Sequence, residues 1–356
     1  MKLLKRTLQW ILGIVLLLLL AAAGLVLYLT ITEYRPAETE ALEVLSPGDR
    51  TLSAEDPLTV ISFNIGYGGL GEGQDFFMDG GEMVRPDQDA VEENLAGITE
   101  VLQEQAADVY FLQETDRHSK RSYDTDETAM LRGALGKSSA FARNYQCNYV
   151  PYPLPTIGHV ESGLLTLTDL AVTDAARVSL PVPFSWPLRT ANLKRCLLVE
   201  RIPVGESGRE LILVNLHLEA YDDGEGKIAQ TKKLAQLISE EYKKGNYVIA
   251  GGDFNQTFPG VLEKYPITQT ENWEPGVLDA DAFSGFGTLA YDDRAPTCRL
   301  LDAPYQPGST QVYVIDGFIV SENVSVEAVE TLDLGFENAD HNPVKLTVSL
   351  SGEEEE

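Results

Sequence analysis

The sequence is poor in the residues that form disulfides and bind soft metals. It contains three cysteines and four histidines among 356 residues. Cys147, Cys196 and Cys298 have no zinc-motif spacing, and an odd number of cysteines cannot all pair within one chain. These counts argue against a disulfide scaffold and a cysteine-based zinc module, and we expect three buried, free thiols.

Basic residues are also scarce. The chain has 27 Lys and Arg against 55 Asp and Glu, which gives a formal net charge of −28. Such a charge repels a polyanion at long range and argues against tight, non-specific nucleic-acid binding. It does not exclude a nuclease with a small local basic patch or one that relies on metal ions. A hydrophobic content of 44% is enough for a sizeable core and argues against global disorder.

The N-terminus carries a charge-free apolar run from Trp10 to about Ile31. The run is long enough to cross a bilayer as a helix, and the basic residues in the preceding MKLLKRTLQ favour a cytoplasmic N-terminus. We therefore expect a single-pass protein of the cell membrane with the rest of the chain outside. The alternative is a secreted protein whose signal peptide is cleaved at AAAG, residues 21–24. Because the apolar run continues past this point, we favour the uncleaved anchor.

Composition divides the chain into four parts. Residues 1–32 are the expected anchor, and the polar, proline-containing residues 33–57 are expected to form a tether. Residues 58–350 have the alternating apolar and polar segments of a folded domain. Residues 351–356, GEEEE preceded by a serine, are an acidic tail.

Eight short apolar segments rich in Val, Ile and Leu are predicted to be strands: 58–65, 108–114, 162–168, 194–202, 210–219, 246–254, 312–320 and 343–350. Two segments have helical spacing of apolar residues: Val91, Leu95, Ile98, Leu102 and Ala106 in one, and Ile228, Leu234, Ile238 and Tyr242 in the other. Strands 194–202 and 210–219 are joined by a short loop and are expected to be antiparallel. The order of elements predicts an α/β or α+β sandwich of mixed sheets with helices outside.

Polar side chains recur where the predicted strands end: Asn64, Gln113, Glu114, Asn215, His217, Asp253, Asn255, Asp340 and His341. Each alone has a plain structural explanation, such as a turn or a solvated end. Asp316 differs because it lies inside the apolar run VYVIDGFIV, where a buried carboxylate needs a charged or hydrogen-bonding partner. In VIAGGDFN, the two glycines are predicted to turn the chain sharply and present Asp253 and Asn255.

The types of these residues indicate phosphate-ester chemistry. Carboxylates and amides with few sulfurs favour a hard cation such as Mg²⁺. Such an ion stabilises charge on a phosphoryl group, while a carboxylate or a His–Asp pair activates water.

The motifs SFNI, LQE, VNLHLE, GGDFN, VIDGFIVS and ADHNPV occur in the order found in the endonuclease/exonuclease/phosphatase superfamily, which the chain resembles over about residues 58–350. The protein is similar to a membrane-anchored, bacterial-type member. The resemblance implies a four-layered sandwich of two mixed β-sheets flanked by helices, preceded here by the N-terminal helix.

The resemblance also implies residue roles. Glu114 would be the principal ligand of Mg²⁺, with Mn²⁺ as a substitute, assisted by Asn64 and Asp340. Asp253 would orient or deprotonate the attacking water, and His341, oriented by Asp316, would face the phosphate. His217 would be a second imidazole, with Glu161 as its positional partner. Asn64, Asn215 and Asn255 would contact the substrate phosphate.

The sequence leaves the substrate open. The expected anchor favours a phospholipid or a lipid-linked headgroup as the phosphodiester substrate. An extracellular magnesium-dependent nuclease is the alternative within this chemistry, and a catalytically silent surface binding module is the alternative outside it. Lys194 and Arg195 either touch a substrate phosphate or lie on an edge strand with outward charges. The segment HLEAYDDGEGK at His217 is either an acidic rim of the site or a solvated loop, and we favour the loop. No protein partner is inferred.

Overall fold

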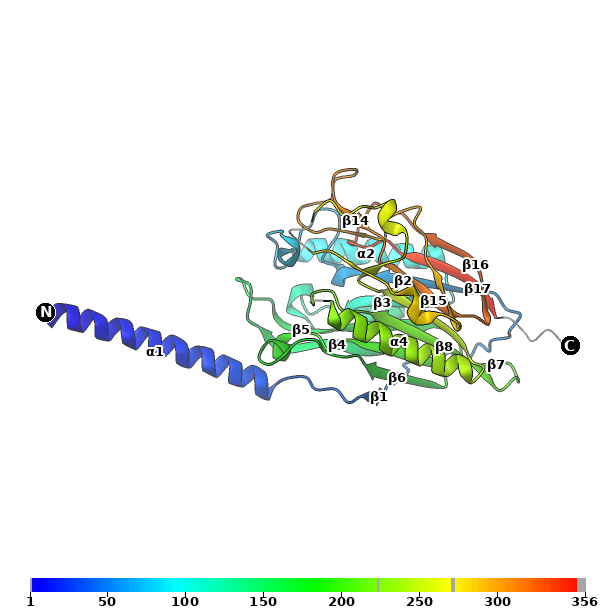
Figure 1. Cartoon of the computed structure of the whole chain (residues 1–356), viewed down its shortest axis with the longest axis horizontal. Helices are drawn as coiled ribbons and strands as arrows, with labels where there is room; N and C mark the ends of the chain where they lie inside the picture. Colours follow the sequence, from blue (N-terminus) through cyan, green and yellow to red (C-terminus); the bar gives the residue numbers. More distant parts are fainter. Residues whose placement is uncertain (1, 223, 270–272, 351–356) are drawn as a thin grey trace.

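The computed structural model describes residues 2–222, 224–269 and 273–350. The expected acidic tail therefore lies outside the described residues. Four α-helices are present in the described part: α1 (Lys2–Ile31), α2 (Gln88–Gln105), α3 (Glu127–Leu135) and α4 (Glu225–Lys243). The long α1 projects from one side of a compact body (Figure 1).

Two large mixed sheets form the body. The first has the order β1 (Thr39–Ala41), β6 (Asp174–Ser179), β7 (Cys196–Val204), β8 (Arg209–His217), β9 (Tyr247–Asp253), β15 (Asp316–Ser321) and β12 (Gly287–Ala290). The second has the order β16 (Val324–Thr331), β17 (Val344–Leu350), β2 (Leu58–Asn64), β3 (Val109–Asp116), β5 (Gly158–Thr168) and β4 (Ser138–Val150). Short pairs join β10 (Gln256–Thr257) to β11 (Gly276–Val277) and β13 (Cys298–Arg299) to β14 (Val312–Tyr313).

The layers follow from which faces are apolar. Side chains such as Val60, Phe111, Leu213 and Ile249 fill the space between the two sheets. Ile98 and Leu102 of α2 pack on the outer face of the second sheet, and α4 covers the outer face of the first (Figure 1). The predicted four-layered sandwich of two mixed sheets between helices is confirmed.

The structure corrects several details of the sequence prediction. The predicted strand 312–320 is broken between β14 and β15. Strands β4, β6, β12 and β16 and helix α3 were not predicted, because their apolar residues are interleaved with polar ones. Ala106 caps α2 in a left-handed conformation, and Ile228 is 54% exposed, so neither belongs to the buried face of its helix.

The two glycines before Asp253 do not form a turn, as was predicted; both lie within β9. A Cβ atom at Gly252, whose φ is +150°, would lie 1.9 Å from the carbonyl oxygen of Leu216. At Gly251 it would lie 2.2 Å from the ring of Phe318. The glycines therefore permit close approach of the neighbouring strands rather than a change of chain direction.

The segment between α1 and β2, expected to be a tether, contacts the sheets. Thr39–Ala41 pairs with β6, Leu45 forms a bridge with Ser139, and Leu52 is buried in the core. The most apolar 18 residues of α1 have a mean hydropathy of 2.9 and none of them is buried, whereas Leu29 near the end of the helix packs on the domain. By length and composition it can cross a membrane, and a signal sequence at an N-terminus has the same properties.

Candidate active site

The register of three neighbouring strands collects polar residues at one end of the first sheet. β8 and β9 are parallel and pair His217 with Asp253, and β9 and β15 are antiparallel and pair Asp253 with Asp316. On the second sheet, the pairing of parallel β2 and β3 ends at Asn64 and Gln113. The ends of both sheets therefore carry side chains to one edge of the sandwich, which is where open α/β sheets bind ligands.

His341 is held by a buried carboxylate. Its Nδ1 lies 2.8 Å from Oδ2 of Asp316, so Asp316 accepts the ring proton and exposes Nε2 on the other side. Nε2 lies 3.4 Å from Nδ2 of Asn64 and 3.8 Å from Oδ2 of Asp253. The predicted contact of Asp316 with His341 is present. His341 is therefore the partner that a buried carboxylate in the apolar run VYVIDGFIV needs.

Asp253 is the centre of the cluster. Its Oδ2 accepts a hydrogen bond from Nδ2 of Asn64 at 3.1 Å and lies 3.3 Å from Nε2 of His217. Its Oδ1 accepts from the backbone N–H of Asn255 at 2.8 Å. Asn255 has a φ of +50°, and such a conformation at a non-glycine residue is uncommon and concentrates at functional sites.

Glu114 and Asp340 supply carboxylate oxygens that a hard cation would need. The predicted ligand Asn64 instead turns its Nδ2 toward Glu114, and its Oδ1 accepts from the backbone N–H of Gly66 at 3.1 Å. Glu114 has a φ of +52° at a β-bulge in β3, and its Oε1 accepts a hydrogen bond from Nδ2 of Asn64 at 3.2 Å. Oδ1 of Asp340 is buried and has no hydrogen-bond partner among the described residues. An orphaned buried carboxylate oxygen near another carboxylate fits a bound divalent cation.

A second set of close ligand atoms contains Asp253, Asp316 and His341. In this set Nδ1 of His341 is already engaged by Asp316 at 2.8 Å. Hydrogen bonds therefore explain this arrangement without a metal, and the oxygen-rich group around Glu114 is the better cation site.

The electrostatics of the cluster are strongly perturbed. Burial, with repulsion from Asp316, raises the pKa of Asp253 to about 7, against the opposing effect of His341. Burial and Glu114 raise the pKa of Asp340 to about 7 in the same way. Burial disfavours a charge on His341, but Asp316 overcomes this and raises its pKa. Burial and the nearby Arg195 lower the pKa of His217. The pKa of His341 is thus raised, whereas the pKa of His217 is lowered.

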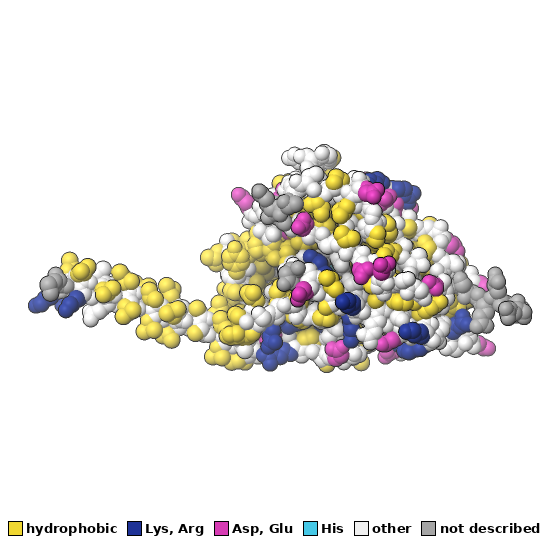
Figure 2. Space-filling view, in the orientation of Figure 1, with side chains coloured by type: hydrophobic (Ala, Val, Ile, Leu, Met, Phe, Trp, Pro, Cys, Tyr) yellow, Lys and Arg dark blue, Asp and Glu magenta, His cyan; other side chains and the backbone are white. Residues whose placement is uncertain are grey.

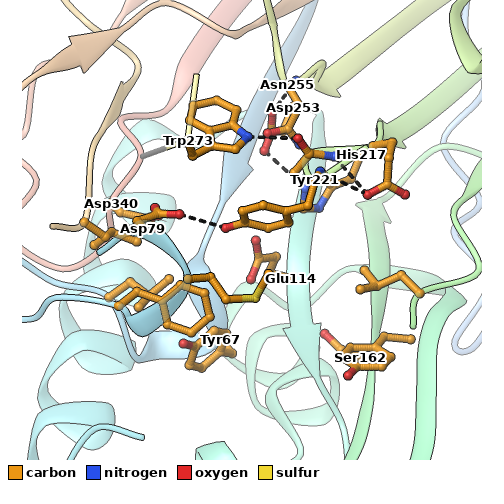
Figure 3. Close-up of a pocket in the computed structure, with 18 of the residues that line it drawn as sticks. Tyr67, Asp79, Glu114, Ser162, His217, Tyr221, Asp253, Asn255, Trp273 and Asp340 are labelled. Atoms are coloured by element: carbon orange, nitrogen blue, oxygen red, sulfur yellow. Dashed lines mark hydrogen bonds and ion pairs between the residues drawn. The ribbon is translucent and has the colours of Figure 1, made fainter. Parts of the chain in front are cut away.

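A cavity of about 320 Å³ is lined by six residues of this cluster: Glu114, His217, Asp253, Asn255, Asp340 and His341. Figure 3 shows Glu114, His217, Asp253 and Asn255 around it, together with Tyr221 and Trp273. The segment that follows β2 forms one wall through Tyr67, Leu70, Phe76, Met78, Asp79 and Val84. The hydroxyl of Tyr221 donates to Oδ1 of Asp79 at 2.9 Å and so joins this wall to the loop after β8 (Figure 3).

Arg195 and Glu219 both line the cavity, whereas the sequence alone did not place either residue there. Arg195 is 4% exposed, and its Nη1 has no hydrogen-bond partner among the described residues. Its Nε lies 3.9 Å from Oε2 of Glu219, which is too far for a hydrogen bond. Part of HLEAYDDGEGK therefore lines the site, contrary to the solvated loop that we favoured. Arg195 lies directly before the buried strand β7, and this position is the feature by which the sequence indicates it.

Two predicted site residues have other roles. Glu161 pairs with Arg143, with Oε1 2.6 Å from Nη2, and the partner that approaches His217 is Asp253, so the predicted pair of Glu161 with His217 is wrong. Arg143 on β4 lies opposite Gly163 on β5, two residues from Glu161, so the two side chains are diagonal neighbours across this strand pair. Asn215 lies between the sheets, where Gln113 donates to its Oδ1 at 2.8 Å, and it is not among the residues that line the cavity.

The sequence profile of the Endonuclease/Exonuclease/phosphatase family matches residues 61–335. A comparison with curated proteins gave no match. Among solved structures, an endonuclease/exonuclease/phosphatase from Beutenbergia cavernae is similar, with a TM-score of 0.58 and 16% identity over 83% of this chain and 72% of that one.

Two proteins of Bacteroides thetaiotaomicron are also similar. An endonuclease/exonuclease/phosphatase family protein has a TM-score of 0.52 and 18% identity over 84% of this chain and 99% of its own. The mannosyl-6-phosphatase Bt3783 has a TM-score of 0.51 and 18% identity over 82% of this chain and 99% of its own. At these identities the similarity establishes a shared fold, and the substrates of these proteins do not transfer to this chain.

Proposed function

Because the chain belongs to the endonuclease/exonuclease/phosphatase family, whose members hydrolyse phosphoesters, we propose that it is a magnesium-dependent phosphodiesterase acting on a membrane lipid headgroup. The observation that carries the hydrolytic part is the contact of buried Asp316 with His341, whose Nε2 faces Asp253 in the cavity. In this proposal residues 58–350 form the catalytic domain and residues 1–32 anchor it to the cell membrane, with the domain outside.

The protein's own side chains divide the reaction. Asp253 accepts the proton of a water that attacks phosphorus, and its raised pKa suits a base that works near neutral pH. Asp316 keeps the Nδ1 proton of His341, so that the charged ring stabilises the phosphoryl oxygens through Nε2. His217, beside Asp253, helps to fix its carboxylate, and Asn255 is positioned to contact the phosphate.

Glu114 and Asp340 would hold Mg²⁺, or Mn²⁺ in its place, and Asn64 would orient the carboxylate of Glu114 through its Nδ2 hydrogen bond. The ion supplies positive charge that offsets the charge developing on the phosphoryl group. The support is chemical: Glu114 and Asp340 offer carboxylate oxygens, and the buried Oδ1 of Asp340 has no hydrogen-bond partner among the described residues.

Arg195 is proposed to bind the substrate phosphate. A buried guanidinium with an unengaged Nη1 that faces a cavity is well suited to an anion, which it binds with fork geometry. Glu219, 3.9 Å away, compensates its charge only in part. This local positive charge allows an acidic protein to bind a phosphate ester.

The lipid part of the proposal rests on a rim of exposed apolar side chains beside α1. We define the apolar rim as Tyr152, Leu154, Trp186 and Leu188, which are 71%, 83%, 56% and 66% exposed. Figure 2 shows hydrophobic side chains gathered on the side of the body that α1 joins. Apolar clusters of this kind on a soluble surface indicate contact with a membrane or another apolar partner.

The rim is tied both to α1 and to the cavity. Trp186 donates from Nε1 to Oγ1 of Thr30 at 3.0 Å. The buried Glu33, just beyond α1, lies 3.3 Å from Nε of Arg189 and so fixes the end of the helix to the domain. Ile157 lines the cavity and packs in the same cluster as Leu29 of α1. A membrane crossed by α1 would therefore lie against the mouth of the cavity.

The test uses the full chain in mixed micelles with Mg²⁺. Three substrates are compared: a lipid phosphodiester such as sphingomyelin or phosphatidylglycerol, plasmid DNA, and a soluble aryl phosphodiester. We expect turnover of the lipid and of the aryl ester, both lost in His341→Asn. Cleavage of DNA without cleavage of lipid would support the nuclease instead. Equal behaviour of the parent and His341→Asn on all three would overturn the enzymatic proposal and favour a binding module.

A further inference from the structure

Two of the four histidines lie outside the catalytic cluster and meet at one carboxylate oxygen. Nδ1 of His118 lies 2.9 Å from Oδ1 of Asp124, and Nε2 of His159 lies 2.7 Å from the same oxygen. The two rings stack with their centroids 4.6 Å apart and their planes 30° apart. One nitrogen of each stacked ring faces Oδ1 of Asp124, although His118 and His159 come from different segments of the chain.

The backbone holds Asp124 in this position. Tyr123 and Asp124 have φ values of +57° and +59°, two consecutive left-handed conformations at non-glycine residues. The N–H of Asp124 donates to the carbonyl of Ser119 at 2.9 Å, and the hydroxyl of Tyr123 donates to the carbonyl of Pro86 at 2.8 Å. Such conformations cost free energy and persist where the surrounding contacts require them. Here they turn the carboxylate toward the two imidazoles.

We propose that His118, Asp124 and His159 bind a divalent transition-metal ion of the Zn²⁺ class. Two imidazole nitrogens and one carboxylate oxygen are a common zinc ligand set, and the exposure of the cluster leaves the fourth position to water. Imidazole selects such ions over Mg²⁺, so this site differs chemically from the oxygen-rich site at Glu114.

The geometry needs a small adjustment to accept the ion. Metal–ligand bonds of about 2.0–2.1 Å in a tetrahedron place ligand atoms about 3.3 Å apart. The two nitrogen–oxygen distances of 2.9 and 2.7 Å would therefore open by about half an ångström. The side chains of His118 and Asp124 are more than half exposed, so small side-chain rotations can supply this shift.

The site would join two segments that border the catalytic cavity. In the sequence, His118 and Asp124 flank Arg121, which lines the cavity. Cζ of Arg121 lies 3.7 Å from the ring centroid of Tyr67. His159 follows the cavity residue Ile157 at the start of β5. A bound ion would thus clamp the loop after β3 to β5 and stabilise this wall. The inference rests on the cluster itself and holds whatever the substrate.

The test measures Zn²⁺ binding to the full chain in detergent, with excess Mg²⁺ to occupy oxygen-rich sites. Equilibrium dialysis should give one Zn²⁺ per chain, and Co²⁺ in its place should show the visible absorption of a tetrahedral nitrogen–oxygen site. His118→Ala and His159→Ala should each weaken Zn²⁺ binding at least about 100-fold, more than typical losses of outer-shell partners. Glu114→Gln should leave this binding unchanged, which separates it from the catalytic site.

Glu93→Gln, which removes an exposed carboxylate on α2, is the matched surface control and should bind Zn²⁺ like the parent. Zn²⁺ should also raise the unfolding temperature of the parent and of Glu93→Gln but not of His118→Ala, because binding to the native state alone stabilises it. Equal Zn²⁺ affinity in the parent and a His118→Ala/His159→Ala double variant would overturn the proposal. So would a parent that binds no Zn²⁺, and the cluster would then be only hydrogen-bonded.

Discussion

Nδ1 of His341 lies 2.8 Å from Oδ2 of Asp316, although the two residues are 25 positions apart in the chain. Asp316 begins β15 and is paired with Asp253 across the sheet, whereas His341 lies just before β17 in the other sheet. The contact therefore joins the two sheets at the edge where the cavity opens. It also fixes which ring nitrogen of His341 faces Asp253.

The first prediction concerns this contact. Asp316→Asn keeps the shape of the side chain but removes the charge that sustains the protonated ring of His341. We expect kcat to fall about 100- to 10,000-fold, as happens when a catalytic histidine loses its carboxylate, with little change in KM. The measurement is steady-state turnover of the soluble aryl phosphodiester, with circular dichroism to verify the fold. Turnover within threefold of the parent would show that Asp316 has no part in catalysis.

Sequence reasoning located most of the cluster because the relevant signal is local. A polar residue at the end of a strand-like apolar segment, as in Asn64, Glu114 and Asp253, lies at or near the end of a buried strand, and strand ends of one sheet meet at one edge. The pairing of Asp316 with His341 was implied by resemblance and by the cost of burying an unpaired carboxylate. Neither argument required knowledge of the register.

The predictions that failed concern contacts that depend on strand register or that join residues distant in the chain. Glu161 was assigned to His217 by position, but the pairing of β4 with β5 places it diagonally across from Arg143, to which it bonds. Asn215 shares the strand-end pattern, yet its side chain lies between the sheets and bonds to Gln113. Asn215 and His217 are two residues apart on β8 and therefore project from the same face of the sheet. They differ in depth: His217 ends the strand and lines the cavity, whereas Asn215 lies further inside, between the sheets.

The second prediction concerns Arg195. Arg195→Gln removes the buried charge, and we expect KM for the aryl phosphodiester to rise about tenfold or more, as for the loss of one charged hydrogen bond. Arg195→Lys keeps the charge without the planar fork and should recover only part of this loss. The check is the ratio of KM values of the two variants. An unchanged KM in Arg195→Gln would remove the residue from substrate binding.

The third prediction concerns the metal. Glu114→Gln removes a charged ligand, and we expect its Mg²⁺ concentration for half-maximal activity to rise at least about tenfold. EDTA should abolish activity of the parent, and added Mg²⁺ or Mn²⁺ should restore it. The matched control is Glu93→Gln, an exposed carboxylate on α2, which should titrate with Mg²⁺ like the parent. Full activity in EDTA would contradict any role for a cation.

The fourth prediction concerns the apolar rim. Replacing Leu154 and Leu188 by serine removes exposed apolar area without touching the cavity, so activity on lipid vesicles should fall several-fold while activity on the soluble ester is kept. Val326→Ser is the control, since Val326 is an exposed apolar residue on β16, away from α1 (Figure 1). A parallel loss on both substrates would instead indicate damage to the site.

The last prediction concerns a buried carboxylate outside the active site. Glu200 lies on β7 between Leu198 and Ile202, which both face the apolar space between the sheets. Its Oε2 has no hydrogen-bond partner among the described residues, and burial raises its pKa from the usual 4.5 to about 8. In the folded protein the carboxyl therefore holds its proton across a range where the unfolded chain has lost it.

The sign of the pH dependence follows from this difference. The stability that the neutral carboxyl gives is complete below pH 4.5 and is lost as the pH rises through about 8. Each pH unit in this window costs about 1.4 kcal/mol, so the parent should unfold more easily at pH 8 than at pH 5. Glu200→Gln is neutral at every pH and should flatten this dependence, whereas Glu327→Gln, at an exposed position on β16, should not. Unfolding midpoints in urea at the two pH values measure it, and parallel pH profiles for the parent and Glu200→Gln would show that Glu200 is ionised in the folded state.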